Sequence, residues 1–247
     1  MINLRLKVIF ESESDISYIP LDYRPTLISM LKSALMNTPY YNELFRKKTI
    51  KPYTWSVYFG KEFKITNNSL QTSKNISFYF STNDEQLIMV LFNGLLDLKK
   101  KSYKLSFPQV NFSIKTIIPF PPEMYNKSSI YFKTMSPVIL TNPLVSKDEK
   151  NFYVTPQQEF TTFQYILNLQ TRKKLELLGL ENIYKDILFE NINTKDTLIR
   201  HYGGFIKGFT GFFKITSSPQ IITFLYETGM GVKTGSGFGY LDKVGEE

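Results

Sequence analysis

The strongest constraint on the fold is the order of strand-like and helix-like segments, which is the same in both halves of this 247-residue chain. Residues 1–120 show the order β-α-β-β-α-β, which is that of a ferredoxin-like domain. Residues 121–247 show the same order again. The sequence therefore predicts an α+β fold of two tandem ferredoxin-like (RRM-like) βαββαβ domains with a C-terminal glycine-rich loop. The alternative is one irregular α+β domain.

Hydrophobic periodicity gives the elements of the first half. Apolar and polar residues alternate over residues 2–10, which predicts a half-buried strand, and a loop containing Pro20 follows. The other predicted elements are helices at 22–36 and 39–45, aromatic-rich strands at 53–59 and 76–81, a helix at 86–98 and a last strand at 104–118. Strand alternation places half of the aromatic side chains in the core, and the alternative for them is a stacking platform for RNA bases.

The run Pro119-Phe120-Pro121-Pro122 marks the boundary between the halves, because clustered prolines oppose both a helix and an interior strand. The elements predicted beyond it are a strand at 129–140, a helix at 155–178, strands at 187–191 and 201–217, a helix from 218 or 219 to 227 and a strand at 240–244. Two domains of similar size, 1–120 and 121–247, are the expected organisation.

Charge and composition limit the function. The chain has 30 Lys and Arg residues against 22 Asp and Glu residues, a formal net charge of +8, which favours a polyanionic partner. It has no Cys and one His, so disulfides, Cys-ligated zinc and multi-His metal sites are excluded, and we expect no metal and no cofactor. No apolar run is long enough to span a membrane and no signal-peptide core is present, so we expect a soluble, cytoplasmic protein without a membrane partner.

The most distinctive local feature is a segment near the C-terminus with five glycines in eleven residues, residues 229–239. Such a segment lets the backbone approach a ligand closely, and its successive N–H groups can form a nest for an anion. The order helix–loop–strand is the reverse of that in phosphate-binding loops of nucleotide-binding proteins. The predicted RNA-binding residues of this segment are Gly229, Gly231, Lys233, Thr234, Gly235, Ser236, Gly237 and Gly239. The alternative is a glycine-rich hairpin without a ligand.

The spacing of these glycines, GMG-VKTGS-GFG, resembles the G-h-G-x5-G-h-G loop of the repeat-associated RNA-binding superfamily. Together with the duplicated domain order, the chain length and the segment from Lys51 to Ser56, it resembles the CRISPR repeat-processing endoribonucleases of the Cas6 family. The resemblance implies metal-independent cleavage of CRISPR repeat RNA. In that reaction the ribose 2′-OH attacks the adjacent phosphate and leaves a cyclic phosphate and a free 5′-OH.

The sequence departs from the family where catalysis is concerned. Many members carry a His after the first helix, a Tyr in that helix and a Lys downstream. Here Asn42 or Phe45 occupies the His position and Lys32 the Tyr position, whereas Lys51 matches the family Lys. The candidate catalytic residues are Lys51, Tyr40, Lys48 and Lys32. Cleavage is therefore expected to be slow, with charge stabilising the phosphorane, and the alternative is an RNA-binding protein that does not cut.

A basic, glycine-rich hairpin from Arg200 through Lys207 to Lys214 corresponds to a hairpin that approaches the RNA stem in relatives. Its predicted RNA contacts are Arg200, His201 and Lys207. His201 is favoured as an RNA contact or a surface residue over a role as the missing catalytic acid. The run from Lys99 to Lys104 is better explained as a charged connection after a helix than as a contact to the RNA backbone.

Three functions remain open from the sequence. The first is an endoribonuclease that matures repeat RNA, and the second is a non-catalytic binder of that RNA or a subunit of a CRISPR interference complex. The third is an unrelated two-domain protein. The expected partner is CRISPR repeat RNA, with interference-complex subunits or a second copy of the chain as further partners.

Overall fold

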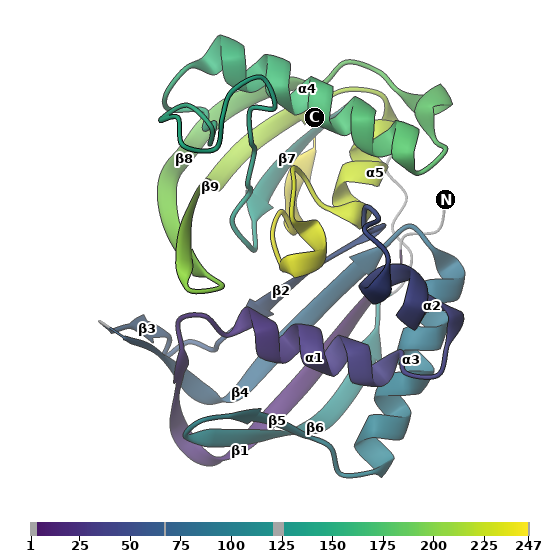
Figure 1. Cartoon of the computed structure of the whole chain (residues 1–247), viewed down its shortest axis with the longest axis vertical. Coiled ribbons are helices and arrows are strands. Elements are labelled where there is room, and N and C mark those ends of the chain that lie inside the picture. The colour runs from purple at the N-terminus through teal and green to yellow at the C-terminus, as the bar shows by residue number, and fades with distance from the viewer. Residues whose placement is uncertain (1–3, 67, 121–125, 247) are drawn as a thin grey trace.

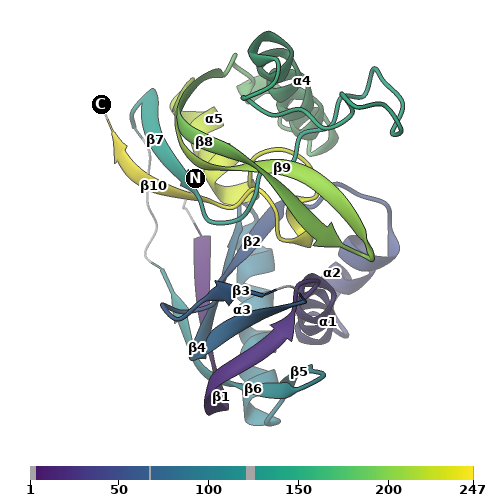
Figure 2. The ribbon, with the colours of Figure 1, turned by 90° about the vertical axis from the view of Figure 1, so that its left-hand side faces the viewer.

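The protein has two antiparallel sheets, each with its own helices, one in the lower half and one in the upper half of the view (Figure 1 and Figure 2). The computed structural model describes residues 4–66, 68–120 and 126–246. The first sheet has the strand order β2-β4-β1-β6-β5, with β3 paired to β4. Its strands are β1 (Leu4–Pro20), β2 (Tyr53–Tyr58), β3 (Lys64–Ile65), β4 (Ser69–Thr82), β5 (Lys104–Phe107) and β6 (Val110–Pro119).

Two helices, α1 (Arg24–Ala34) and α3 (Glu85–Lys100), pack against one another and against this sheet (Figure 1). Helix α3 begins one residue before the predicted start, and Asp84 caps it: its side chain accepts a hydrogen bond from the backbone N–H of Leu87 at 2.9 Å. Their apolar faces and the inward side chains of the strands make one core, which holds Trp55. Two short turns, α2 (Pro39–Tyr41) and the π-helical η1 (Asn42–Arg46), connect α1 to β2.

The second sheet has the order β10-β7-β9-β8, which is that of a ferredoxin-like fold, and the first sheet has the same order with β5 added at its edge. The elements are β7 (Ser129–Thr134), β8 (Leu188–His201), β9 (Gly204–Thr216), β10 (Leu241–Glu246), α4 (Phe160–Leu177), α5 (Pro219–Thr228) and the 3₁₀ turns η2 (Glu181–Ile183) and η3 (Thr234–Ser236). The predicted tandem ferredoxin-like fold is confirmed. The exact division at residue 120 stays a prediction, and residues 121–125 lie outside the described residues.

Two predicted elements of the first half are wrong in extent. Strand β1 continues to Pro20, because residues 16–20 pair with β4 beyond a bulge that follows Glu11. The single strand predicted at 104–118 is the hairpin of β5 and β6. Pro108, which lacks an N–H group, lies in the turn between them.

Three predictions in the second half also need correction. The strand predicted at 129–140 ends at Thr134, before Pro137, and the helix predicted from 155 begins at Phe160 after a turn that contains Pro156. The short strand predicted at 187–191 extends to His201. Its second part is polar, so backbone pairing with β9, and not an apolar pattern, extends it.

Helix α5 joins the two domains. The guanidinium of Arg5 in β1 donates hydrogen bonds to the carbonyl oxygens of Tyr226 (2.9 Å) and Leu241 (2.8 Å), and it stacks 3.2 Å above the Tyr226 ring. Beside it, the carboxylate of Glu227 is fully buried and accepts no hydrogen bond from any described residue. None of the helices in the described part of the chain is long and apolar enough to cross a bilayer.

Candidate nucleic-acid interface

Residues 229–239, which we call the glycine-rich loop, connect α5 to β10 and lie between the two sheets (Figure 1). Both ends of the loop are buried, and only its tip at residues 231–236 is partly exposed, apart from Thr234. Gly237 has φ 82° and lies so close to Trp55 that a Cβ would come within 2.6 Å of the indole ring. Only glycine fits this position.

The glycine-rich loop is bound to the first domain through its carbonyl groups. Thr54 Oγ1 donates to the Phe238 carbonyl at 2.8 Å, and Trp55 Nε1 donates to the Gly235 carbonyl at 3.0 Å. The Phe238 side chain is fully buried, with the Arg24 guanidinium 4.3 Å above its ring. Half of the loop therefore packs against the first domain, and RNA contact by its glycines stays a prediction.

The tip of the loop has the geometry of an anion nest. Lys233 adopts the left-handed conformation, with φ 59°, and the turn η3 follows it directly. Within the described part of the chain, the backbone N–H groups of Lys233, Thr234 and Gly235 donate no hydrogen bond. Three successive free N–H groups of this kind attract an anionic oxygen.

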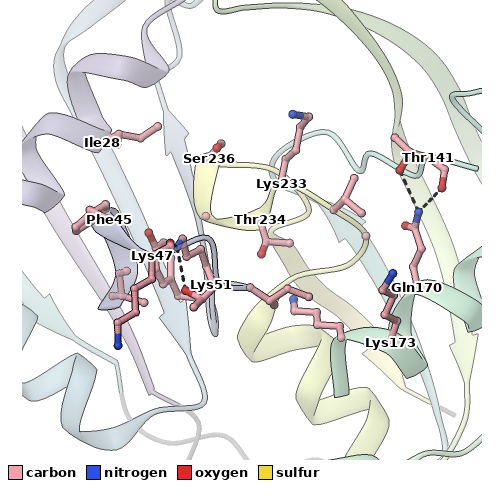
Figure 3. Close-up of a pocket in the computed structure, with 18 of the residues that line it drawn as sticks. Ile28, Phe45, Lys47, Lys51, Thr141, Gln170, Lys173, Lys233, Thr234 and Ser236 are labelled. Atoms are coloured by element: carbon pink, nitrogen blue, oxygen red, sulfur yellow. Dashed lines mark hydrogen bonds between the residues drawn. The ribbon is translucent and has the colours of Figure 1, made fainter. Parts of the chain in front are cut away.

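The tip lines a cavity of about 820 Å³ between the two domains, which we call the lysine cavity (Figure 3). One wall comes from α1, η1 and the segment before β2, and includes Ile28, Lys32, Phe45, Lys47 and Lys51. The opposite wall comes from α4, the segment after β7 and the β8–β9 hairpin, and includes Thr141, Leu169, Gln170, Lys173, Lys174 and Tyr202. Figure 3 shows the loop residues Lys233, Thr234 and Ser236 between these walls.

The lysine cavity is strongly positive. Among the described residues that line it, six are lysines, and none is an Asp, Glu or His. The six are Lys32, Lys47, Lys51, Lys173, Lys174 and Lys233. Positive charge gathered in a concave surface concentrates field lines, which favours a polyanion such as RNA. Over the described residues, no group of three or more His, Cys, Asp or Glu side chains forms a cluster suited to a metal ion.

Lys51 lies beside the loop tip. Its Nζ donates to the Lys47 carbonyl (3.4 Å) and to Thr49 Oγ1 (3.2 Å), and partial burial lowers its pKa. Its stem packs against Gly235, where a Cβ would come within 2.5 Å of Lys51 Cγ. The absence of a side chain at residue 235 thus lets the loop and Lys51 share one wall of the cavity.

Lys174 has a structural role at the floor of the cavity. Its Nζ donates to the carbonyl oxygens of Thr228 (2.8 Å) and Gly229 (3.1 Å), which end α5 and begin the loop. Burial lowers the pKa of Lys174 to about 7. Helix α4 therefore holds the base of the glycine-rich loop in place.

The predicted catalytic residues separate in the structure. Lys32 and Lys51 line the cavity, whereas Lys48 does not. Tyr40 lies outside it, and its hydroxyl donates to the Asp84 carboxylate at 2.9 Å. Burial, reinforced by Asp84, raises the pKa of Tyr40. Between the two residues proposed for the family His position, Phe45 lines the cavity and Asn42 does not.

The predicted contacts of the β8–β9 hairpin also separate. Arg200 is exposed, and Lys207 forms an ion pair with Asp196 at 2.7 Å. His201 is buried, which overturns the surface-residue alternative, and its ring meets Phe238 edge-on at 5.2 Å. Burial, with the charges of Lys233 and Arg24, lowers the pKa of His201 to about 4.

Sequence reasoning missed the wall formed by the second domain, which includes Thr141, Gln170, Lys173, Lys174 and Tyr202. The run Arg172-Lys173-Lys174 was a possible signal, but basic residues on a helix usually face solvent. Only the packing of α4 against the loop distinguishes the buried Lys174 from its exposed neighbours.

Comparison with known proteins places these features in context. The family described as CRISPR associated protein Cas6, C-terminal, matches residues 120–243. The chain is 25% identical over 230 residues to an endoribonuclease-like Cas6 protein of Pyrococcus furiosus, covering 90% of this chain and 85% of that protein. It is 24% identical over 173 residues to the Cas6nc protein of Pyrococcus horikoshii, covering 70% of each.

Solved structures show the same fold. The product of a Cas6-related gene from Pyrococcus furiosus gives a TM-score of 0.85 at 23% identity, over 99% of this chain and 100% of the other. A structure described as a RAMP protein binding different RNA substrates gives a TM-score of 0.80 at 20% identity, over 98% of this chain and 100% of that one. Both likenesses extend over the two domains together.

Proposed function

The chain belongs to the Cas6 family of CRISPR-associated proteins, and on that premise we propose that it binds CRISPR repeat RNA in the lysine cavity. The observation that carries the proposal is the cavity itself, in which six lysines and the tip of the glycine-rich loop meet and none of the described lining residues is an Asp or Glu. Lysines neutralise phosphates and release counterions, so binding is tight at low salt and weakens as salt rises.

The proposal includes slow cleavage by attack of the ribose 2′-OH on the adjacent phosphate. The new P–O2′ bond forms as the P–O5′ bond breaks, and the 2′-OH proton is lost while the 5′-oxygen gains one. The products are a 2′,3′-cyclic phosphate and a free 5′-OH. Lys32 and Lys51 stabilise the charge of the phosphorane, and no metal ion is required. Proton transfer falls to water or a lysine, since Tyr40 is bonded to Asp84.

A second candidate is a repeat-RNA binder that does not cut. It is favoured by the lining of the cavity, in which the described ionisable side chains are those of lysine and tyrosine only. Loss of a general acid or base typically lowers a rate by about 10²–10⁴-fold. Interaction with subunits of an interference complex and formation of a homodimer remain predictions from the sequence.

One experiment separates these candidates. Excess protein is incubated with its repeat RNA in EDTA, beside the same RNA carrying a single 2′-deoxy substitution at each position in turn. A product that ends in a cyclic phosphate and disappears with one substitution supports cleavage. RNA that is bound but intact after long incubation supports the non-catalytic binder, and absence of binding overturns both.

A further inference from the structure

We propose that the lysine cavity holds one unstacked nucleotide of the bound RNA, with its base on an apolar wall and its phosphate at the loop tip. The inference rests on the proposed RNA-binding function and specifies what the RNA must present there. The site combines apolar walls, cationic groups and a fixed polar edge in one cavity. A phosphate alone would contact only the cationic groups.

The apolar wall has contributions from both domains and the loop. Ile28 and Phe45 are partly buried side chains at the surface of the first core, and Leu169 holds the same position on the second core. Val232 belongs to a small third cluster that includes Phe238. All four line the cavity, so hydrophobic surface faces its interior from both walls and from the loop. A nucleobase has the flat, apolar faces that such a surface binds.

A polar side chain lies at the edge of this wall. The side-chain amide nitrogen of Gln170 donates to the carbonyl and the hydroxyl of Thr141 (Figure 3). These bonds fix the orientation of the amide, because a flipped amide would place its oxygen against the Thr141 carbonyl. Among the described residues, no donor reaches the Gln170 amide oxygen, which is buried. The buried oxygen is closed to a ligand, so the amide contributes a fixed polar boundary to this wall and not a direct contact to the base.

The size of the cavity and the spread of its charges suit a nucleotide. Its volume of about 820 Å³ lies in the range of about 300–1,000 Å³ that is typical of small-molecule sites. Lys233 on the loop, Lys51 on one wall and Lys173 on the other are positioned for phosphate oxygens. A paired base cannot enter such a cavity without leaving its helix. The RNA bound there is therefore single-stranded at this nucleotide.

The test uses the repeat RNA in a series in which each member lacks one base. For the wild type, we expect removal of one particular base to weaken binding about ten-fold, the size of one stacking contact. In Val232→Phe the new ring fills the base position. The variant should therefore bind intact RNA as weakly as the wild type binds the abasic RNA, and removal of that base should not weaken its binding further. Val244→Phe, on the exposed strand β10, is the matched control and keeps the wild-type pattern.

Two results overturn the inference while leaving the proposed function intact. One is wild-type binding that no single abasic position changes by more than two-fold. The other is a Val232→Phe protein whose binding still weakens about ten-fold when that base is removed. Ile28→Trp, on the wall formed by the first domain, repeats the test if Val232→Phe does not fold. If the wild type binds no repeat RNA, the proposed function fails and the inference fails with it.

Discussion

Gly237 lies directly against Trp55, with space for no atom beyond its Cα: a Cβ there would approach Trp55 Cη2 to 2.6 Å. The same indole donates its N–H to the Gly235 carbonyl, two residues earlier in the loop. A tryptophan of the first domain thus determines the path of the glycine-rich loop of the second. The position of the loop tip depends on this contact between domains.

Gly237→Ala should destabilise the protein by about 3 kcal/mol, because a Cβ meets the Trp55 ring and φ is 82°. Gly203→Ala is the matched control. Gly203 has φ 78°, but no atom lies within 4 Å of the position that a Cβ would take there, so the cost should be about 1 kcal/mol from backbone strain alone. Urea unfolding gives both values. Equal losses of unfolding free energy in the two variants would show that the clash with Trp55 adds nothing to the cost of Gly237→Ala.

Lys233→Ala and Lys173→Ala should each weaken RNA binding and reduce the slope of log K against log salt by about 1, because each removes one phosphate contact. The two residues lie on the loop and on α4, so the changes should add. Filter binding at several salt concentrations measures the slopes.

Lys101→Ala is the control for these variants, since Lys101 is an exposed lysine at the end of α3 that does not line the cavity. Its slope should equal that of the wild type. If Lys101→Ala reduced the slope as much as Lys233→Ala does, the RNA would follow the run at residues 99–104, and the lysine cavity would lose its assigned role.

Phe45→His should raise the cleavage rate about 10²-fold, because it places an imidazole, which can act as a general acid or base, in the cavity that Lys51 also lines. Asn42→His is the comparison, since Asn42 does not line the cavity and its imidazole would have no access to the phosphate. Single-turnover assays in EDTA give both rates. Equal rates for the two variants would contradict the position assigned to the reacting phosphate.

Glu227→Gln, at the domain interface, should remove one source of pH dependence from the free energy of unfolding. Burial raises the pKa of Glu227 to about 8, so the folded state binds its proton more tightly than the unfolded state does. This contribution to stability is complete below the unfolded pKa of about 4.5 and is lost as pH rises through about 8. The wild type should therefore lose about 1 kcal/mol or more relative to Glu227→Gln between pH 5 and 9.

The measurement is the free energy of unfolding at several pH values, with Glu62→Gln, an exposed carboxylate in the loop before β3, as the control. The control should parallel the wild type across the whole range. Parallel curves for Glu227→Gln and the wild type would mean that the Glu227 carboxylate is ionised in the folded protein at neutral pH.

The sequence predicts the fold well where patterns are local. The alternation in β1 and the order of elements in both halves correspond to the structure. The errors lie where pairing between distant residues decides the length of a strand. An example is the polar second part of β8, where pairing with β9 extends the strand to His201. No local pattern encodes that pairing.

The candidate site is predicted in part. The glycine spacing identifies the loop, and the family resemblance identifies Lys51 and Lys32, all of which meet in the lysine cavity. The glycine spacing and the family resemblance do not show which loop groups are bonded carbonyls and which are free N–H groups. They also do not show that Lys173 and Gln170 lie across the cavity from Lys51. These relationships arise from the packing of α4 and α5 across a domain boundary, over more than 100 residues of sequence.

Photo-crosslinking of 4-thiouridine-containing repeat RNA, with the modified peptides identified by mass spectrometry, tests the central claim most directly. The account predicts crosslinks to residues 231–236 of the loop and to the part of α4 around Lys173. Crosslinks confined to the outer face of the second sheet, around the exposed Phe212, with none in the loop or α4, would contradict it.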